Sequence, residues 1–252
     1  MDGGGMSPPR KKESRAQTLA FVFALCLGCG LVLSLLATAL RKPQQEAVQV
    51  NQITELLTAA RLIDPTDPPP KSELFAIYNK RIQALFTTED GTVSSPEKLH
   101  TDLAAYIAKH QKKGYACLKE KLFYRIASKD GKTLEGIVIP INGFGLWDAI
   151  YGYLAIKSDG VHVIGTTWYS QKETPGLGAE IATPAWQKQF VGKSIFKDGA
   201  LGIVVAKGMA HADNAVDGLP GATLTGEGVT RAYQTSLAPY RALLEKMKKG
   251  SL

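Results

Sequence analysis

The chain has 252 residues, 44% of them hydrophobic and 21% charged, which is ordinary for a globular protein of one large domain or two small ones. Its formal charge of +7 would suit a polyanionic partner, but six of the 30 basic residues flank one apolar stretch near the N-terminus. From Pro43 onward the remaining 24 basic residues stand against 21 acidic ones. This near balance argues against nucleic acid as a partner.

An uncharged apolar segment of 23 residues, 18–40, comes first along the chain. A helix of this length can cross a hydrocarbon core of about 30 Å, so we predict one membrane-spanning helix. A cleavable signal peptide is the alternative, but the apolar run exceeds the usual signal core of about 7–15 residues. Four Lys and Arg residues precede the segment and two follow it, which predicts a cytoplasmic segment 1–17 and an extracytoplasmic remainder.

Three helices are predicted between the apolar segment and the main domain. Apolar residues recur at helical spacing over residues 44–63, and a proline-rich stretch at 64–70 ends that helix. The same spacing predicts helices over 72–86 and 96–110. We interpret residues 41–115 as a helical connector.

The main domain is predicted to cover residues 116–252, where the apolar pattern becomes strand-like. The turn sequences K-D-G-K and S-D-G each separate two such stretches, which predicts two β-hairpins. The expected strands cover 122–127, 133–141, 151–157, 161–169 and 201–206, and the expected helices cover 184–192 and 226–248. Strands grouped together with helices at the margins predict an α+β fold with antiparallel strands and peripheral helices.

Glycine is concentrated in three segments, 142–147, 173–178 and 217–223, and each follows a predicted strand. Glycine lets the main chain approach a ligand closely, so three such segments at strand ends could converge on a flat cofactor. Each segment taken alone is better interpreted as a plain turn. None is a dinucleotide-binding or Walker motif.

Residues 217–225 read D-G-L-P-G-A-T-L-T and resemble the attachment motif of FMN-binding domains, D-G-x-(S/T)-G-A-T-x-(S/T). In that family the threonine after the alanine carries the FMN phosphate as a phosphoester, which implies this role for Thr223. The blocks E-T-P-G-L-G-A-E-I at 173–181 and G-L-W-D-A-I-Y-G-Y at 145–153 resemble the NqrC family of the sodium-translocating NADH:quinone oxidoreductases. With the N-terminal apolar segment, the resemblance covers nearly the whole chain.

The resemblance implies that FMN is held by residues of all three glycine-rich segments. Besides Thr223, the implied cofactor-binding residues are Gly145, Leu146, Trp147, Glu173, Thr174, Gly176, Leu177, Gly178, Lys207, Asp217, Gly218, Gly221, Ala222 and Thr225. Trp147 either stacks on the flavin ring or fills the core, and Lys207 either neutralises an anionic flavin or phosphate or is simply solvated. The four histidines have no ligand spacing, so no metal site is predicted.

A threonine hydroxyl is a poor nucleophile at neutral pH, so formation of the phosphoester requires a base and a metal ion from outside. The resemblance assigns them to a separate flavin transferase that uses FAD. A helix beginning near Gly226 would point its free N–H groups and positive dipole end at the phosphate. Without the motif, Thr223 and Thr225 would be interpreted as helix caps.

The chain departs from the family pattern at two positions. Pro220 stands where the family has Ser or Thr, and Gln171 stands where many relatives have His. The flavin-carrying RnfG family of the related Rnf electron-transport complex shares the anchor, the E-T-P-G-L-G block and the attachment motif. The sequence G-L-W at 145–147, followed by Tyr151 and Gly152, favours NqrC.

The resemblance implies a flavin electron carrier in the bacterial inner membrane, with its flavin domain in the periplasm. Such a carrier takes electrons from an iron centre in the membrane subunits and passes them towards a second covalent FMN, within a complex that oxidises NADH, reduces ubiquinone and moves sodium. The alternative is a membrane-tethered hydrolase or binding module without flavin. A hydrolase needs a nucleophile beside a base, and neither a G-x-S-x-G elbow nor a clear Cys–His setting around Cys117 is present.

Overall fold

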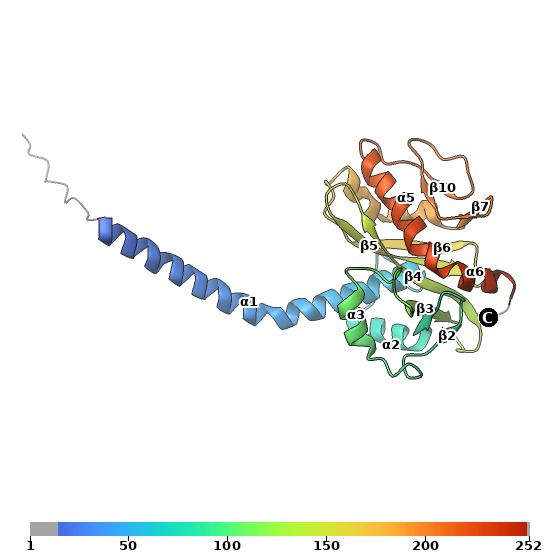
Figure 1. Ribbon diagram of the computed structural model, residues 1–252, viewed down its shortest axis with the longest axis horizontal. Coiled ribbons are helices and arrows are strands. Elements are labelled where there is room, and N and C mark those ends of the chain that lie inside the picture. Colours follow the sequence, from blue (N-terminus) through green and yellow to red (C-terminus); the bar gives the residue numbers. More distant parts are fainter. Residues whose placement is uncertain (1–14, 251–252) are drawn as a thin grey trace, which may run out of the picture. The chain divides into compact units, whose positions relative to one another are not determined.

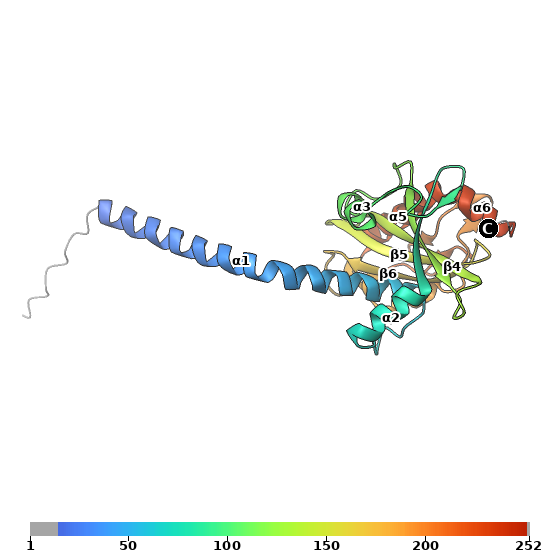
Figure 2. The same ribbon diagram turned by 90° about the horizontal axis from the view of Figure 1, so that it is seen from below.

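Residues 15–250 are described in a computed structural model of the chain (Figure 1). The chain divides into two compact units, Met1–Gln49 and Val50–Leu252. Helix α1 (Arg15–Ala59) is continuous over 45 residues and contains Pro43 (Figures 1 and 2). The helices expected over 18–40 and 44–63 are therefore one helix. Among the described residues, α1 alone is long and apolar enough to cross a membrane.

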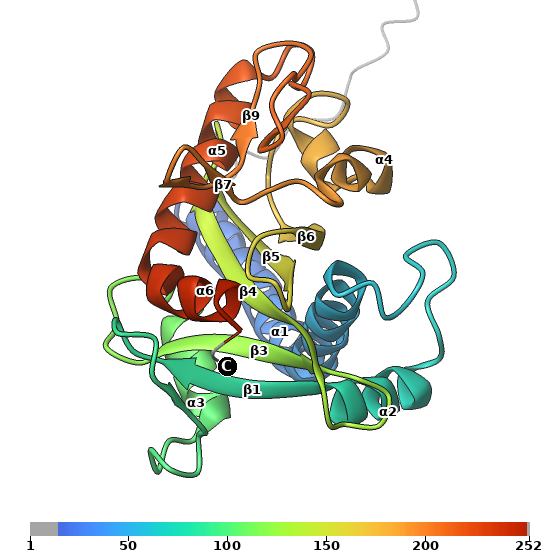
Figure 3. The same cartoon turned by 90° about the vertical axis from the view of Figure 1, so that its right-hand side faces the viewer.

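The second unit is built on a six-stranded sheet with the order β2-β1-β3-β4-β5-β6 (Figure 3). All neighbouring strands in it are antiparallel. The strands are β1 (Ile82–Thr87), β2 (Val93–Ser94), β3 (Lys121–Ala127), β4 (Leu134–Phe144), β5 (Ala149–Lys157) and β6 (Val163–Ser170). Both predicted hairpins are confirmed, with Gly131 and Gly160 at positive φ in their turns.

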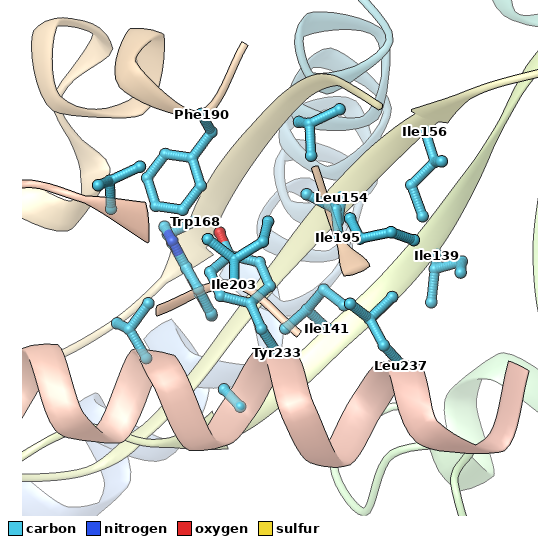
Figure 4. Packing of buried hydrophobic residues seen from close by; sticks show 14 of the residues in the cluster. Ile139, Ile141, Leu154, Ile156, Trp168, Phe190, Ile195, Ile203, Tyr233 and Leu237 are labelled. Atoms are coloured by element: carbon cyan, nitrogen blue, oxygen red, sulfur yellow. The ribbon is translucent and has the colours of Figure 1, made fainter. Parts of the chain in front are cut away.

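Helices cover both faces of this sheet. On one face lie α5 (Thr223–Leu237) and α6 (Arg241–Lys248), and Figure 4 shows Tyr233 and Leu237 of α5 packed against strand residues such as Ile141. The end of α1, together with α2 (Lys71–Arg81) and α3 (Leu103–His110), covers the other face. Because both faces are covered, most of β3 and the middle of β4 are buried at consecutive positions rather than at alternate ones.

The segment between β6 and α5 forms short elements that pack against β6 and α5. They are η1 (Gly178–Ala182), α4 (Pro184–Gln187), η2 (Lys188–Phe190), β7 (Phe196–Lys197), β8 (Ala200–Leu201), β9 (Val204–Val205) and β10 (Ala215–Val216). Strand β10 pairs with β9 in parallel. This segment carries the second and third glycine-rich sequences to the N-terminal end of α5.

Two predicted helices of the connector range are wrong in extent. The helix expected over 72–86 ends at Arg81, and the next six residues form β1, because they pair with β3 from Ile82↔Ile126 to Thr87↔Lys121. The helix expected over 96–110 covers only α3, since His100 has a φ of 49° and the Asp102 side chain caps α3. The range 41–115 is thus partly sheet and not wholly helical.

Three later elements also differ from expectation. The single strand expected over 201–206 is divided into β8 and β9 at Gly202, whose φ is 136°. The helix expected over 184–192 is only the short pair α4 and η2. The helix expected over 226–248 begins three residues earlier, at Thr223, and the 3-10 turn η3 (Ala238–Tyr240), which contains Pro239, separates α5 from α6.

Candidate functional site

A tight turn leads directly into α5. The Ala222 N–H donates to the Leu219 carbonyl at 3.0 Å, with Pro220 and Gly221 between them, and Gly221 has a φ of 74°. Proline followed by a glycine at positive φ is the arrangement of a type II turn. Ala222, the N-cap residue, has no capping side chain, so no side chain of the turn blocks the first N–H groups of α5.

The two threonines of the attachment motif have opposite environments. Thr223 is the first residue of α5 and is exposed. Thr225 is only 1% exposed, and its hydroxyl donates to Oε2 of Glu173 at 2.6 Å. A reagent in solvent can therefore reach the Thr223 hydroxyl but not the Thr225 hydroxyl.

Glu173 is a buried carboxylate that accepts three hydrogen bonds. Besides Thr225, the backbone N–H groups of Leu146 and Trp147 donate to its two oxygens, each at 3.0 Å. Burial alone would raise the pKa of the Glu173 carboxyl, but the hydrogen bonds from Thr225 and the two backbone amides outweigh it and hold the pKa below its ordinary value. The carboxylate is thus charged at neutral pH. The side chain of Gln171 accepts from the Glu173 N–H at 2.6 Å.

The backbone approaches this carboxylate closely on two sides. A Cβ on Gly145 would lie 2.5 Å from Oε1 of Glu173. A Cβ on Gly178 would lie 2.6 Å from the Thr225 hydroxyl and 2.9 Å from the Glu173 side chain. Glycine is required at both positions for this packing. The first two glycine-rich segments meet at Glu173, and Thr225, two residues after the third segment, also binds it. The third segment lies against the second at Gly221, where a Cβ would be 2.9 Å from Leu177.

Trp147 lies at the surface, so the alternative that it fills the hydrophobic core is wrong. Its side chain is 68% exposed, and its indole N–H donates to the Thr174 hydroxyl at 3.2 Å. Other large apolar side chains near the start of α5 are exposed as well. We call the following set the exposed apolar collar: Phe144, Leu146, Trp147, Leu177, Met209 and Leu224.

An open depression of about 860 Å³ lies beside Thr223. Seven of the predicted site residues line it: Gly176, Leu177, Lys207, Asp217, Gly218, Gly221 and Thr223. The sequence did not identify Trp186, Gln189 and Met209, which line it too. Met209 is 77% exposed, and an apolar residue beside Lys207 and Gly208 was the signal that could have indicated it.

Two residues of the attachment motif, Asp217 and Gly218, form hydrogen bonds to neighbouring segments. Asp217 accepts from the Ala210 N–H at 2.7 Å, and its carbonyl accepts from the Trp186 indole N–H at 3.2 Å. The Gly218 N–H donates to the Gly208 carbonyl at 2.8 Å. These bonds hold residues 206–210 against the motif and form one wall of the depression.

Lys207 and Ala222 occupy different positions in the site. The Lys207 side chain is 79% exposed, and its ammonium lies 3.3 Å from Oε1 of Glu227. It is therefore solvated and paired to a neighbour, although it lines the depression. Ala222 is buried, with 6% of its surface exposed, and contributes its backbone to the turn rather than a side chain to the depression.

Comparison with known proteins identifies the family. The family model of FMN-binding domains matches residues 145–238, which include the Gly145–Trp147 loop, Glu173 and Thr223. The chain is 34% identical to the C subunit of the Na(+)-translocating NADH-quinone reductase of Chlamydia caviae, over 92% of both chains. It is 32% identical to the same component of the Yersinia pestis enzyme, over 97% of both. The chain belongs to this family, NqrC.

Solved structures of the NqrC family share the fold. The structure of the family member from Parabacteroides distasonis has a TM-score of 0.64 and 27% sequence identity, covering 81% of this chain and 96% of that one. NqrC of Shewanella oneidensis has a TM-score of 0.62 and 27% identity, covering 81% of this chain and 99% of that one. The expected α+β FMN-binding domain is confirmed, and neither the RnfG family nor the flavin-free hydrolase is favoured.

Proposed function

We propose that this chain is the flavin-carrying electron-transfer subunit of a Na(+)-translocating NADH-quinone reductase, with FMN joined by a phosphoester to Oγ1 of Thr223. The observation that carries the site assignment is the contrast between two neighbouring hydroxyls. Thr223 is exposed at the edge of the depression, whereas Thr225 is buried and donates its proton to Glu173. Only the Thr223 hydroxyl is available for modification.

The start of α5 supports a bound phosphate. The first i to i−4 bond of this region runs from the Gly226 N–H to the Ala222 carbonyl at 3.0 Å. The N–H groups of Thr223, Leu224 and Thr225 precede it and have no partner within the helix. A helix N-terminus stabilises an anion through such groups and through its dipole, and α5 is 15 residues long. A phosphate on Thr223 would lie at this end of the helix.

The surroundings of Thr223 suit a large planar ring. Leu177 and Met209 of the exposed apolar collar line the depression beside Thr223, and Trp147 belongs to the loop that Glu173 joins to the first turn of α5. Exposed apolar groups of this kind gain by contact with an aromatic ligand. Lys207 places its ammonium, paired with Glu227, at the depression, and Gly176 allows the main chain to come close. The bound FMN supplies the electron-carrying chemistry, while the protein holds and orients it.

The membrane context of the proposal rests on α1 and on the relatives. We propose that α1 anchors the chain in the bacterial inner membrane beside the other subunits of a complex that oxidises NADH, reduces ubiquinone and translocates sodium. We also propose that a separate flavin transferase attaches the FMN, because the exposed Thr223 hydroxyl needs a general base and a metal ion to activate it.

The basic residues around 18–40 support a cytoplasmic segment 1–17 and a periplasmic flavin domain. Reporter fusions at the C-terminus test this orientation. A periplasmic reporter should be active there and a cytoplasmic one silent, and the reverse result would contradict the proposed topology.

The attachment site is tested by expressing the chain with a flavin transferase and measuring intact mass and in-gel flavin fluorescence after denaturation. Thr223→Val should carry no covalent flavin, because it has lost the only atom that the phosphoester requires. Thr223→Ser should keep it, and Thr225→Val is the matched control that loses a hydroxyl but keeps the acceptor. Flavin that persists in Thr223→Val, or disappears only in Thr225→Val, would move the attachment site.

A further inference from the structure

We propose that Glu173 is a positioning residue whose carboxylate ties the loop Gly145–Trp147 to the first turn of α5, and so sets where Trp147 stands relative to Thr223. This inference rests on the proposed function, since it concerns how the flavin site is held. The sequence resemblance places Glu173 among the residues that bind the cofactor. Its side chain instead faces inward and is only 5% exposed.

The carboxylate joins segments that are far apart in the chain. Its Oε2 accepts from the Leu146 N–H at 3.0 Å and from the Thr225 hydroxyl at 2.6 Å, while Oε1 accepts from the Trp147 N–H at 3.0 Å. The donors belong to a loop after β4 and to α5. One side chain therefore fixes both, and hydrogen bonds to a charged acceptor are among the stronger ones in proteins.

Trp147 depends on this arrangement because its ring is mostly in solvent. Two hydrogen bonds lead from it to the segment 173–174: its amide donates to Glu173, and its indole N–H donates to the Thr174 hydroxyl. With 68% of its side chain exposed, core packing does not hold the ring in place. The position of Trp147 is thus set from residues 173 and 174.

No other side chain reproduces the three contacts. Aspartate keeps the charge but is one methylene shorter, so it cannot reach the loop amides and the Thr225 hydroxyl together. Glutamine keeps the length but replaces one acceptor oxygen by an NH₂ donor, which leaves one loop amide facing a donor. The main chain around the carboxylate leaves no room for a different side-chain arrangement. Gly145 lies directly against the Glu173 carboxylate, and Gly178 lies against the Thr225 hydroxyl.

The test compares Glu173→Asp and Glu173→Gln in the full-length chain, with Glu245→Gln as a charge-loss control at an exposed surface pair on α6. Hydrogen exchange followed by mass spectrometry reports on the peptide that contains Leu146 and Trp147, first without flavin. We expect both Glu173 variants to exchange there about tenfold faster or more, because each loses at least one hydrogen bond to a charged acceptor. The control should match the wild type.

The second readout is the flavin-loaded chain, in which the visible absorption bands and the midpoint reduction potential of the bound flavin are measured. Positioning predicts that Glu173→Asp shifts both, although it retains the negative charge. If only Glu173→Gln shifts them and Glu173→Asp matches the wild type in exchange and spectrum, Glu173 acts by charge alone and the inference is overturned. Unchanged exchange in both variants overturns it as well.

The measurements distinguish a failure of the proposed function from a failure of the positioning role of Glu173. If the wild-type chain takes up no covalent flavin, the phosphoester at Thr223 is wrong, whereas the exchange measurement on the unloaded chain still decides the role of Glu173. If the wild type is loaded and the Glu173 variants behave as it does, the attachment stands and only the positioning role is lost.

Discussion

Gly228 lies in the middle of α5 at the point where the helix crosses the end of β4, and we predict that Gly228→Ala destabilises the domain. A Cβ at this position would overlap the carbonyl oxygen of Phe144 and lie 3.1 Å from the Cα of Gly145. Both atoms belong to the main chain that leads into the Gly145–Trp147 loop. Neither can rotate away as the end of a side chain would.

Two effects of opposite sign set the magnitude. Alanine is favoured over glycine within a helix by about 0.5–1 kcal/mol. Forcing an extra methyl group into a well-packed interior costs about 1–3 kcal/mol, and the upper part of that range applies here because the obstacle is backbone. The net loss is about 1–2 kcal/mol, which lowers the melting temperature of a domain of this size by about 2–8 °C.

Thermal unfolding followed by tryptophan fluorescence measures the change, since all three tryptophans lie in the second unit. Gly226→Ala is the matched control two residues earlier in the same helix, where a Cβ would meet only the Val205 side chain at 3.0 Å. We expect it to stay within about 0.5 kcal/mol of the wild type. A Gly228→Ala chain as stable as the wild type would show that α5 and the end of β4 separate freely, and would refute the reasoning.

Three further predictions follow from the site. Thr225→Val removes a donor from a buried carboxylate and should lower the free energy of unfolding by about 1.5–3 kcal/mol in urea while keeping covalent flavin; unchanged stability would contradict it. Because the pKa of Glu173 lies below its ordinary 4.5 in the folded chain, its stabilising effect is present at neutral pH and is lost as the pH falls through the folded-state pKa. The melting temperature should therefore drop less below pH 4.5 in Glu173→Gln than in the wild type, and equal drops would exclude this residue as the cause. Pro220→Ser should raise flavin attachment when the transferase is limiting. A hydrogen bond from the serine hydroxyl to the phosphate, about 1.5–3 kcal/mol, outweighs the roughly 0.4–1 kcal/mol of chain entropy that proline contributes. Equal or lower attachment would show that the turn geometry set by proline matters more than the hydroxyl.

Local chemistry accounts for what the sequence predicted correctly. Gly131 and Gly160 occupy turns that need a positive φ. The short turn sequences that contain them were therefore enough to locate the two hairpins. The apolar residues of α5 and α6 recur at helical spacing, and those at this spacing are all buried: Val229, Tyr233, Leu237, Leu244 and Met247. These features depend on residues within a few positions of one another.

The conformation of strand β1 could not be predicted from its own residues. Residues 82–87 carry apolar side chains that suit either a helix or a strand over so short a run. Pairing with β3, about 40 residues later in the chain, decided for the strand. The start of α5 was likewise placed three residues late, because the turn through Pro220 and Gly221 ends at Ala222 and lets the helix begin at once.

The sequence by itself determined the membrane-length apolar helix, the α+β class and the attachment motif, including its two threonine hydroxyls. Only the tertiary structure decided that Thr223 is exposed while Thr225 is buried, and that the Glu173 side chain is buried rather than open to solvent. The physical reason is that exposure and hydrogen-bond partners depend on residues from distant segments, here the loop after β4, the segment after β6 and the first turn of α5. A linear motif states which groups are present, and folding determines which of them solvent can reach.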